Sequence, residues 1–584
     1  MRRPSTDTVS PRRAGPACYP LPRLGRPPEP HLAGDPLTEL ATNLLYYGDN
    51  LDILRRYLPG AAIDLVYLDP PFNSNRDYNV IFRDESGNAT DAQLLAFEDT
   101  WHWGPSAEAT YAYLINTARH EGRVPDKVST IIAALRAGIG ENQMMAYLVE
   151  MAVRLVELHR VLKPTGSLYL HCDPTASHYL KLILDALFGP MNFRNEIVWR
   201  RSHPKGHAFT RFASSHDVIL WYAADATKAG WNPTYGEYDP DKVAQQYALR
   251  DESGRAYQLT SLLNPNPDRP NLTYEFKGVT KVWRWTRERM AEEDAIGNIV
   301  VPRGGQGIPR YKRYLDEQEG VPIDDWWGDI EQVAGKERLG WQTQKPVALL
   351  ERIIGASSKP GDVVLDPFCG CGTALIAAEK LGRKWIGIDI TYLSIAVMKA
   401  RLKDSFGIEV PVIGQPTEVE GARQLAQGDD GRYQFQWWAL NLIDARPLGG
   451  TEKKGADRGI DGRITFTVGG KGEMGQALVS VKSGNVNSGM VRDLKGTIER
   501  EGAQIGLFIT LEEPSKPMLL EASTAGVYTS PISGKDYPRL QILSIRQLLE
   551  EHTKPMLPML LMPTYQQAER IPAKQAAEQK ELFG

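Results

Sequence analysis

The chain has 584 residues, of which 42% are hydrophobic and 24% are charged, and its formal net charge is −4. This length predicts two or three domains, and the composition is that of a globular protein that can bury a large core. The slightly negative charge excludes binding of nucleic acid by bulk positive charge, so such binding would need a local basic surface.

Cysteine usage and apolar runs indicate where the protein works. The four cysteines form no C-x-x-C pair and no cluster with histidine, which indicates neither a zinc site nor a disulfide framework. No apolar run is long enough to span a bilayer. Residues 1–42 are rich in proline and arginine, lack the apolar core of a signal peptide, and are expected to be a disordered extension. We therefore expect a cytoplasmic protein that makes no membrane contact.

Apolar runs and helical patterns alternate from residue 43 to residue 222. Strands are expected at 44–47, 63–68, 167–171, 196–200 and 217–222, and helices at 51–58, 140–162 and 178–187. Strands that alternate with helices predict a parallel α/β sheet. Between 223 and 340 the periodicity disappears, and this segment, rich in proline, glycine and tryptophan, is expected to be irregular.

Regular α/β order resumes at residue 341. Helices are expected at 346–357, 373–381 and 392–402, and strands at 363–365 and 385–388. The expected division of the chain is an extension (1–42), two halves of one α/β domain (43–222 and 341–405) around an insert (223–340), a linker (406–428), a third unit (429–550) and a tail (551–584).

The stretch VVLDPFCGCGTALIAAEKLGRKWIGIDI (363–390) reads as a strand, a glycine-rich turn, a helix and a second strand that ends in an acid. Gly370 and Gly372 let the backbone approach a ligand, and the helix that follows offers free N–H groups. Asp389 lies 19 residues after Gly370, where a carboxylate can accept both hydroxyls of a ribose. Such a turn alone suits NAD, FAD, a nucleoside sulfonium or plain packing. Asp366, before the glycines, favours a cationic methionine group over a pyrophosphate.

The pattern D-P-F-x-G-x-G-T resembles the S-adenosylmethionine loop of DNA amino-methyltransferases. The preceding TQKPVALLERIIGASSKPGD (343–362) is similar to the helix and turn that lead into this loop in the same family. The resemblance implies S-adenosylmethionine as cofactor, with Thr343 and Lys345 near its methionine carboxylate. The remaining residues that it assigns to the cofactor are Asp366, Phe368, Gly370, Gly372, Thr373 and Asp389.

The strand at 63–68 ends in Asp69-Pro70-Pro71-Phe72, which matches the family's catalytic D-P-P-[FYW] tetrapeptide. An exocyclic amino group is a poor nucleophile, and the Asp69 carboxylate and Pro70 carbonyl can accept its two hydrogens and stabilise developing positive charge. Pro70 and Pro71 stiffen the loop. Phe72 offers a stacking face to a base removed from the duplex, worth roughly 1–3 kcal/mol. Taken alone, the tetrapeptide is equally compatible with a proline-terminated strand and an exposed phenylalanine.

The catalytic tetrapeptide precedes the cofactor loop, which is the order of the beta group of these enzymes. The resemblance therefore implies a Rossmann-like methyltransferase sheet, circularly permuted, with an inserted target-recognition segment. It also makes Asp49 the candidate that contacts the cofactor adenine. Asp at the first tetrapeptide position favours N6 of adenine, with N4 of cytosine as the alternative. We expect a site-specific DNA methyltransferase in a restriction-modification or phage-defence context.

A basic, aromatic stretch follows the expected strand at 196–200. IVWRRSHPKGHAFTRFASSH (197–216) contains Arg200, Arg201, Lys205 and Arg211 and no acid. Such a loop could hold the phosphates of double-stranded DNA, although a solvated basic hairpin is an alternative. Within the insert, KVWRWTRERM (281–290) is compatible with a groove reader and equally with a structural tryptophan pair.

The third unit, with GADRGIDGRITFTVGGKGEMGQALVSVKSG (455–484), resembles the Mrr-type restriction-endonuclease fold. The resemblance makes Asp461 a Mg²⁺ ligand and Lys482 the residue that polarises water. Ser480 stands where an acid or glutamine is expected, and Asp457 is the candidate second acid. The unit therefore either cuts DNA with Mg²⁺, which would make the chain a combined restriction-modification enzyme, or only grips DNA. A third alternative is a DNA-binding regulator with an inactive transferase. A restriction or defence-system subunit and a second copy of the chain are possible partners.

Overall fold

The computed structural model describes most of the chain. Between residues 77 and 98 it gives the backbone of two strands without their side chains. The described residues are 40–71, 77–83, 89–98, 101–203, 210, 212–302, 304–305, 307–341, 343–427, 431–448, 460–469, 473–558 and 568–571.

A nine-stranded sheet, the largest among the described residues, has the strand order β16-β6-β7-β5-β2-β17-β18-β1-β19. From β5 to β19 all neighbours pair in parallel, whereas β7 runs antiparallel to β5 and β6. The bounds are β1 Leu44–Tyr47, β2 Ile63–Leu68, β5 Leu162–Cys172, β6 Phe193–Trp199, β7 Asp217–Ala223, β16 Trp326–Trp327, β17 Val363–Asp366, β18 Lys384–Asp389 and β19 Val412–Ile413. The early strands β1 and β2 flank β18 and β17, so both halves of the chain share one sheet. The predicted fold class is confirmed.

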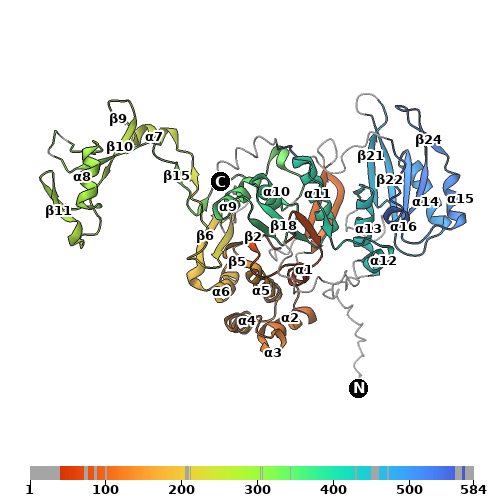
Figure 1. The fold of residues 1–584 in the computed structure, drawn as a ribbon. Coiled ribbons are helices and arrows are strands. Elements are labelled where there is room, and N and C mark those ends of the chain that lie inside the picture. Colours follow the sequence, from red (N-terminus) through yellow and green to blue (C-terminus); the bar gives the residue numbers. More distant parts are fainter. Residues whose placement is uncertain are drawn as a thin grey trace, which may run out of the picture. The chain divides into compact units, whose positions relative to one another are not determined.

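Helices cover both faces of this sheet. Figure 1 shows α9, α10 and α11 on one face and α1, α5 and α6 on the other. The central strands β2 and β17 are almost entirely buried, which is why they read as continuous apolar runs. The bounds of the helices are α1 Asn50–Tyr57, α5 Gln143–Val161, α6 Ser177–Phe188, α9 Val347–Ser357, α10 Thr373–Lys380 and α11 Tyr392–Phe406. All helices and strands predicted for the two halves are present, with ends shifted by a few residues.

A helical layer and a hairpin lie in a region where the sequence analysis assigned no element. The hairpin consists of β3 (Asp77–Arg83) and β4 (Ala89–Glu98), and the layer of α2 (Pro105–Ile115), α3 (Thr117–His120) and α4 (Asp126–Ile139). Helices α2 and α4 pack on α5 and α6 rather than on the sheet. In α2 only two of the eleven side chains, Ala107 and Leu114, are buried, and the sequence is rich in alanine and tyrosine. A helix with so narrow an apolar stripe gives little periodic signal.

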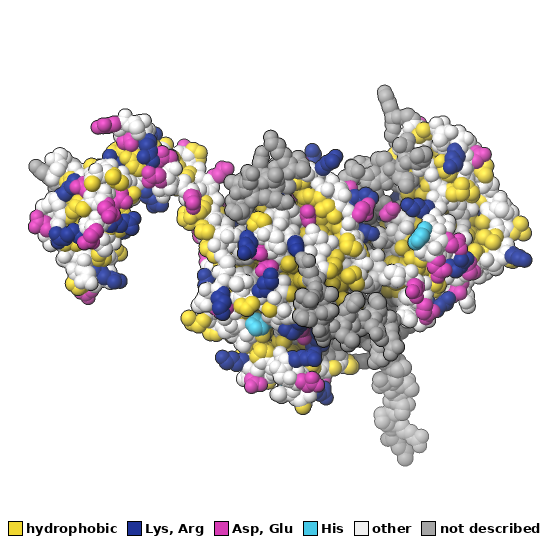
Figure 2. Space-filling model, in the orientation of Figure 1, with side chains coloured by type: hydrophobic (Ala, Val, Ile, Leu, Met, Phe, Trp, Pro, Cys, Tyr) yellow, Lys and Arg dark blue, Asp and Glu magenta, His cyan; other side chains and the backbone are white. Residues whose placement is uncertain are grey.

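Residues 233–324 form a separate compact unit. Its four-stranded sheet has the order β13-β14-β10-β9, and a hairpin pairs β11 with β12. The bounds are β8 Tyr235–Gly236, α7 Pro240–Gln246, β9 Leu249–Arg250, β10 Ala256–Ser261, β11 Thr273–Phe276, β12 Val279–Val282, α8 Arg287–Ala295, β13 Ile299–Val300, β14 Arg310–Tyr314 and β15 Val321–Pro322. Side chains of both charge signs are interspersed on the face of this unit seen in Figure 2.

The expectation of an irregular insert over 223–340 is wrong in two respects. Most strands of the unit are two to six residues long, too short to show periodicity. The end of the expected insert also belongs elsewhere, because β16 pairs with β6 in the main sheet. Trp283 is fully buried in the unit's own core, where its Nε1 donates to the Tyr274 carbonyl 2.8 Å away. Of the two alternatives for the 281–290 stretch, Trp283 therefore takes the structural one.

The C-terminal unit is a five-stranded mixed sheet of order β20-β21-β22-β23-β26. β21 and β22 form an antiparallel hairpin, and β23 and β26 extend it in parallel. The bounds are α12 Val419–Gln427, α13 Gly431–Leu442, β20 Arg446–Pro447, β21 Gly462–Thr467, β22 Met474–Lys482, α14 Ser488–Arg500, β23 Ile505–Thr510, α15 Lys516–Ser523, β24 Val527–Thr529, β25 Asp536–Pro538, β26 Leu540–Ser544 and α16 Ile545–Leu549.

Among the helices described anywhere in the chain, none combines the length and apolarity needed to cross a bilayer.

Candidate active site

Four aspartates gather at one edge of the main sheet. Asp49 follows β1, Asp69 follows β2, Asp366 ends β17 and Asp389 ends β18. These strands are parallel neighbours, so their carboxyl ends lie on the same edge, where ligands of open α/β sheets bind. The topology therefore brings together the two motifs that the sequence separates by about 300 residues.

The glycine loop is held in shape from several sides. Gly370 has φ 52°, and its N–H donates to Asp389 Oδ2 at 2.9 Å. Gly372, with φ 77°, precedes α10, and a Cβ there would lie 2.8 Å from Met398 Cγ. Both glycines therefore occupy positions that a side chain would strain. The indole of Trp341, which the sequence analysis did not single out, lies against Gly370, whose added Cβ would be 3.3 Å from the indole nitrogen.

Asp366 is buried, and its Oδ1 accepts a hydrogen bond from the Phe368 N–H at 3.0 Å. Burial raises its pKa to about 8, and the charges of Asp69 and Asp389 add to the rise, while the hydrogen bond from Phe368 and the charge of Lys345 oppose it. The pKa of Asp366 is thus raised because its carboxyl group is buried and lies near two other acids. A cationic ligand would relieve this repulsion.

Asp69 is held by a lysine from the other half of the chain. Lys345 Nζ forms an ion pair with Asp69 Oδ2, and their side chains are only 11% and 17% exposed. Asp69 Oδ1 is buried and has no hydrogen-bond partner among the described residues. One oxygen is therefore fixed by the lysine, while the other is an acceptor that a ligand could satisfy. The roles of Pro70 and Pro71 stay predictions, and Phe72 lies outside the described residues.

Asp49 caps the helix that follows it. Its Oδ1 accepts from the N–H groups of Leu51 and Asp52, and its Oδ2 accepts from Arg154 Nη2 at 2.8 Å. Arg154 also donates to Asn50 Oδ1, and Asn50 Nδ2 donates to the Pro367 carbonyl at 2.9 Å. The first turn of α1 thus connects α5 to the residue that precedes the glycine loop. Contact between Asp49 and a cofactor adenine stays a prediction.

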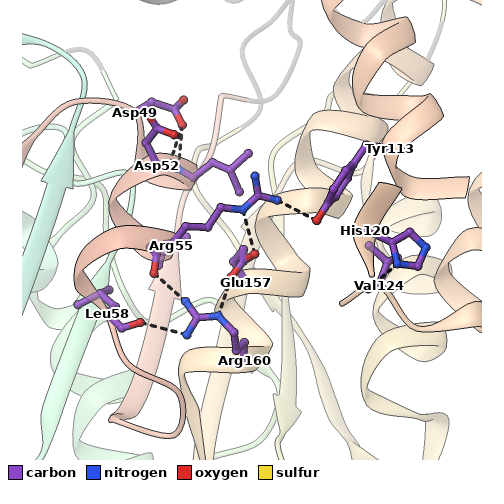
Figure 3. A network of polar contacts seen from close by, with 11 residues as sticks. Asp49, Asp52, Arg55, Leu58, Tyr113, His120, Val124, Glu157 and Arg160 are labelled. Atoms are coloured by element: carbon purple, nitrogen blue, oxygen red, sulfur yellow. Dashed lines mark hydrogen bonds and ion pairs between the residues drawn. The ribbon is translucent and has the colours of Figure 1, made fainter. Parts of the chain in front are cut away.

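The far end of α1 is clamped by the same long helix. Arg160 donates to the Leu54 and Leu58 carbonyls and to buried Glu157, which also accepts from Arg55 (Figure 3). Satisfying the last carbonyls of a helix in this way fixes its end. Arg154 and Arg160 belong to no sequence motif. Nothing in the sequence therefore distinguished them from solvent-exposed arginines of a helix.

Three further predicted cofactor residues have protein partners. Thr343 Oγ1 accepts from Trp341 Nε1 at 3.0 Å, and Thr373 Oγ1 accepts from Arg401 Nη1 at 3.1 Å. Asp389 Oδ1 accepts from the N–H and the hydroxyl of Thr391. Burial raises the Asp389 pKa, and these backbone hydrogen bonds oppose the rise. The three side chains shape the loop, and their contact with a cofactor stays a prediction.

The two described arginines of the expected DNA loop also contact the protein. Arg200 Nη2 donates to the Gly328 carbonyl at 2.8 Å. Arg201 Nη1 forms an ion pair with Asp217 Oδ1 at 3.1 Å, with its own side chain 37% exposed. Lys205 and Arg211 lie outside the described residues. DNA contact by these residues stays a prediction.

In the C-terminal unit the expected metal ligand is enclosed by donors from its own sheet. Asp461 Oδ2 accepts from the Val481 N–H at 2.6 Å, from the Ser480 hydroxyl at 3.3 Å and from Lys482 Nζ at 3.5 Å. Burial raises its pKa, and these contacts oppose the rise. Asp457 lies outside the described residues, and among those described no three His, Cys, Asp or Glu side chains are grouped to hold a metal ion.

Residues 63–397, more than half of the chain, match the model of the DNA methylase family of N6 and N4 methyltransferases. The chain belongs to this family. The match begins at β2 and ends within α11, so it includes the Asp69 tip and the glycine loop together.

Among curated relatives, the type II methyltransferase M.EcaI of Enterobacter cloacae is 34% identical over 250 residues, 42% of this chain and 54% of its own length. The Mod subunit of the type III restriction-modification enzyme StyLTI of Salmonella typhimurium is 24% identical, over 59% of this chain and 50% of its own length. The chain thus spans about half the length of these two relatives. The DNA adenine methyltransferase YhdJ of Escherichia coli is 24% identical over 62% of this chain and 85% of its length.

Residues 447–550 match a second family model, the NACHT-associated inactive Restriction Endonuclease 1. This match covers the five-stranded sheet of the C-terminal unit and fits the restriction-endonuclease-like domain predicted from the sequence.

Proposed function

We propose that the chain is a DNA amino-methyltransferase that transfers a methyl group from S-adenosylmethionine to the exocyclic amino group of a base, and that this group is N6 of adenine. The observation that carries the proposal is the state of the Asp69 carboxylate. Its Oδ2 is fixed by Lys345, and its buried Oδ1 has no hydrogen-bond partner among the described residues. An amino hydrogen is the donor that would satisfy this oxygen.

The residues at the sheet edge fit a cationic methyl donor. Asp69, Asp366 and Asp389 bring acid charge to a desolvated place, and the pKa of Asp366 is raised to about 8 for that reason. Asp366 and the loop at Gly370 would hold the methionine part of the cofactor, and Asp389 its ribose. When bound, S-adenosylmethionine supplies a methyl carbon on a positively charged sulfur, which is attacked by the amino nitrogen.

The protein's own part in the reaction is to hold the amino nitrogen. Asp69 Oδ1 and the Pro70 carbonyl would accept its two hydrogens, so that its lone pair points away from the ring and toward the donor. The Asp69 carboxylate would stabilise the positive charge that the nitrogen gains as its bond to the methyl carbon forms and the bond from that carbon to sulfur breaks. The nitrogen would then lose one proton to water, with S-adenosylhomocysteine as the second product.

Adenine is preferred over cytosine for two reasons. The tetrapeptide begins with aspartate, which is commoner in N6-adenine enzymes of this group. One relative that aligns with 62% of the chain is named a DNA adenine methyltransferase. The Mod relative supports a restriction-modification setting, in which a restriction subunit would be a partner.

For the C-terminal unit we propose DNA or partner binding without cleavage. The observation that favours this function over Mg²⁺-dependent cutting is that Asp461 Oδ2 already accepts three donors. Mg²⁺ prefers several carboxylate and water oxygens in an octahedral set, and Ser480 supplies a hydroxyl where a charged ligand is needed. The combined restriction-modification enzyme is therefore the less favoured alternative.

The decisive test is to incubate unmodified DNA with the full chain and S-adenosylmethionine and then read base modifications by long-read sequencing. We expect one modified adenine within a defined recognition sequence. Asp69→Ala should abolish it, whereas Asp52→Asn, a matched change at an exposed acid of α1, should leave it intact. Modified cytosine would change the base assignment. No modification at any site, with cofactor bound, would overturn the proposal.

A further inference from the structure

A chain of four polar side chains crosses the sheet beside the Asp69 tip. The Tyr67 hydroxyl lies 3.0 Å from His171 Nδ1, and His171 Nε2 lies 3.2 Å from Asp217 Oδ2. Arg201 Nη1 lies 3.1 Å from the other oxygen of Asp217. The four residues come from β2, β5, β7 and the segment after β6, and the proposed transfer of the methyl group has used none of them.

The middle of this chain is fully enclosed. Tyr67, His171 and Asp217 are 2%, 0% and 2% exposed. Burying three polar or ionisable side chains costs free energy unless they satisfy one another, and an apolar set of the same volume would be as stable or more so. Packing alone therefore does not account for these residue types, and a role at the site does.

The chain has a direction. A carboxylate only accepts, so Asp217 fixes the proton of a neutral His171 on Nε2. In this neutral tautomer Nδ1 is the acceptor, and the Tyr67 hydroxyl donates to it. The ring of Trp199 lies edge-on to the His171 ring at 5.8 Å and limits its rotation. The orientation of the Tyr67 phenol is thus set by an acid two strands away.

Tyr67 lies next to the catalytic tip. It precedes Asp69 by two residues, and the charge of Asp69 acts on the Tyr67 hydroxyl. The register of β17 on β2 pairs Leu365 with Val66, the residues that directly precede Asp366 and Tyr67. Burial raises the Tyr67 pKa, and the charges of Asp69, Asp366 and Asp217 raise it further, in accord with a phenol among these acids.

The other end of the chain reaches solvent. The Arg201 side chain is 37% exposed, at the start of the basic stretch expected to meet DNA. Its contact with Asp217 is an ion pair without hydrogen-bond alignment, since Asp217 Oδ1 has no hydrogen-bond partner among the described residues. Lys345, which pairs with Asp69, also attracts the Asp217 carboxylate. Asp217 therefore lies between the exposed arginine and the catalytic ion pair.

We infer that His171 and Asp217 are positioning residues that hold Tyr67 and the Asp69 tip in line, and that Arg201 links this alignment to a DNA phosphate. The inference rests on the proposed methyl transfer to DNA. His171 and Asp217 touch neither cofactor nor base, so their loss should lower the rate of transfer and not the binding of the cofactor. A DNA phosphate that binds Arg201 would weaken the ion pair between Arg201 and Asp217. Through His171, this would change how firmly Tyr67 and Asp69 are held in position.

The test compares Asp217→Asn and Tyr67→Phe with the wild type in the full chain. We expect kcat to fall at least 10-fold in Asp217→Asn and about 3- to 10-fold in Tyr67→Phe, which removes a single hydroxyl. The dissociation constant of S-adenosylhomocysteine should stay within 2-fold. The matched control is His120→Gln, because His120 is a buried histidine of the outer helical layer, 1% exposed, whose Nδ1 accepts from the Val124 N–H (Figure 3).

Two outcomes would overturn the inference. One is a fall of kcat in Asp217→Asn and Tyr67→Phe no larger than that in His120→Gln at equal loss of melting temperature. The other is a ¹⁵N NMR spectrum of the protein labelled in histidine that places the neutral His171 proton on Nδ1. The NMR result needs no methyl transfer. A wild type that modifies no DNA, yet shows the Nε2–H tautomer lost in Asp217→Asn, would therefore count against the proposed function and support the chain itself.

Discussion

Two regions of the molecule contain a partly buried aspartate paired with a lysine, and they differ in what else the aspartate does. At the main sheet, Lys345 holds one oxygen of Asp69, and the other oxygen has no hydrogen-bond partner among the described residues. In the C-terminal unit, Lys482, Ser480 and the Val481 N–H all converge on one oxygen of Asp461.

The two Asp–Lys pairs also differ in the number of other acids near the aspartate. Asp69 lies among Asp366 and Asp389, whose mutual repulsion a cationic ligand would relieve. No other acid is among the described groups that shift the pKa of Asp461. An Asp–Lys pair therefore does not by itself mark an active site. What matters is whether the fold leaves an acceptor and excess charge for a ligand.

The largest expected effect is at Asp69. Asp69→Ala should lower the rate of methyl transfer by roughly 10²- to 10³-fold or more, because it removes the acceptor that stabilises the charged nitrogen. The measurement is incorporation of labelled methyl groups into DNA at saturating cofactor. Asp461→Ala is the matched change at the other pair and should leave this rate within 2-fold. Equal losses at the two positions would remove the functional contrast between the pairs.

The second prediction concerns Asp366 and pH. Burial and the charges of Asp69 and Asp389 raise its pKa to about 8, so its ionised form is disfavoured near neutral pH unless a cation lies beside it. A cationic donor favours the ionised form, so affinity for S-adenosylmethionine should rise between pH 6 and 8 and then level off. Isothermal titration in two buffers should detect proton release at pH 7. Asp366→Asn should bind several-fold more weakly at pH 8 and with a flat pH profile.

The same shift has a consequence for folding. The stabilising contribution of a protonated Asp366 is complete below the unfolded carboxyl pKa of about 4 and is lost as pH rises through 8. S-adenosylhomocysteine lacks the positive sulfur, so its affinity should depend on pH less than that of the methyl donor. If both ligands bind with identical pH profiles, the charge argument for Asp366 is wrong.

The third prediction separates the two lysines. Lys345→Gln should lower methyl transfer about 10-fold, because Asp69 loses the partner that fixes its Oδ2. Lys482→Gln should leave it unchanged. Steady-state kinetics with the recognition sequence as substrate distinguish an effect on kcat from one on KM. An unchanged kcat in Lys345→Gln would show that the ion pair is not needed for the reaction.

The smallest effect is expected for cleavage and stability in the C-terminal unit. Asp461→Asn should lower the free energy of unfolding by about 1–2 kcal/mol, because the hydrogen-bonded charge at the centre of the β22 contacts is lost. The full chain should not cut plasmid DNA with Mg²⁺, before or after this change. Cleavage that Asp461→Asn abolishes would instead make the chain a combined restriction-modification enzyme.

The sequence alone determined the class of fold and the two motifs of the site. The strands of both halves were predictable because buried parallel strands appear in the sequence as apolar runs. The glycine loop was predictable because Gly370 and Gly372 occupy backbone positions that only glycine adopts without strain. The tip at Asp69 was predicted from the resemblance of its tetrapeptide to the family motif, and its role in holding an amino group stays a prediction.

Only the tertiary structure decided which side chains meet. Lys345 and Asp69 are 276 residues apart in the sequence and form an ion pair because β2 and β17 are neighbours in the sheet. No local sequence pattern predicts that these two strands are neighbours. The same holds for Arg154 at Asp49 and for the chain from Tyr67 to Asp217, whose members lie on three strands. The unit at 233–324 was not predicted from the sequence because its strands are too short to show periodicity. Periodicity reports which face of an element is buried, whereas contacts between distant elements depend on strand order, which the sequence does not display.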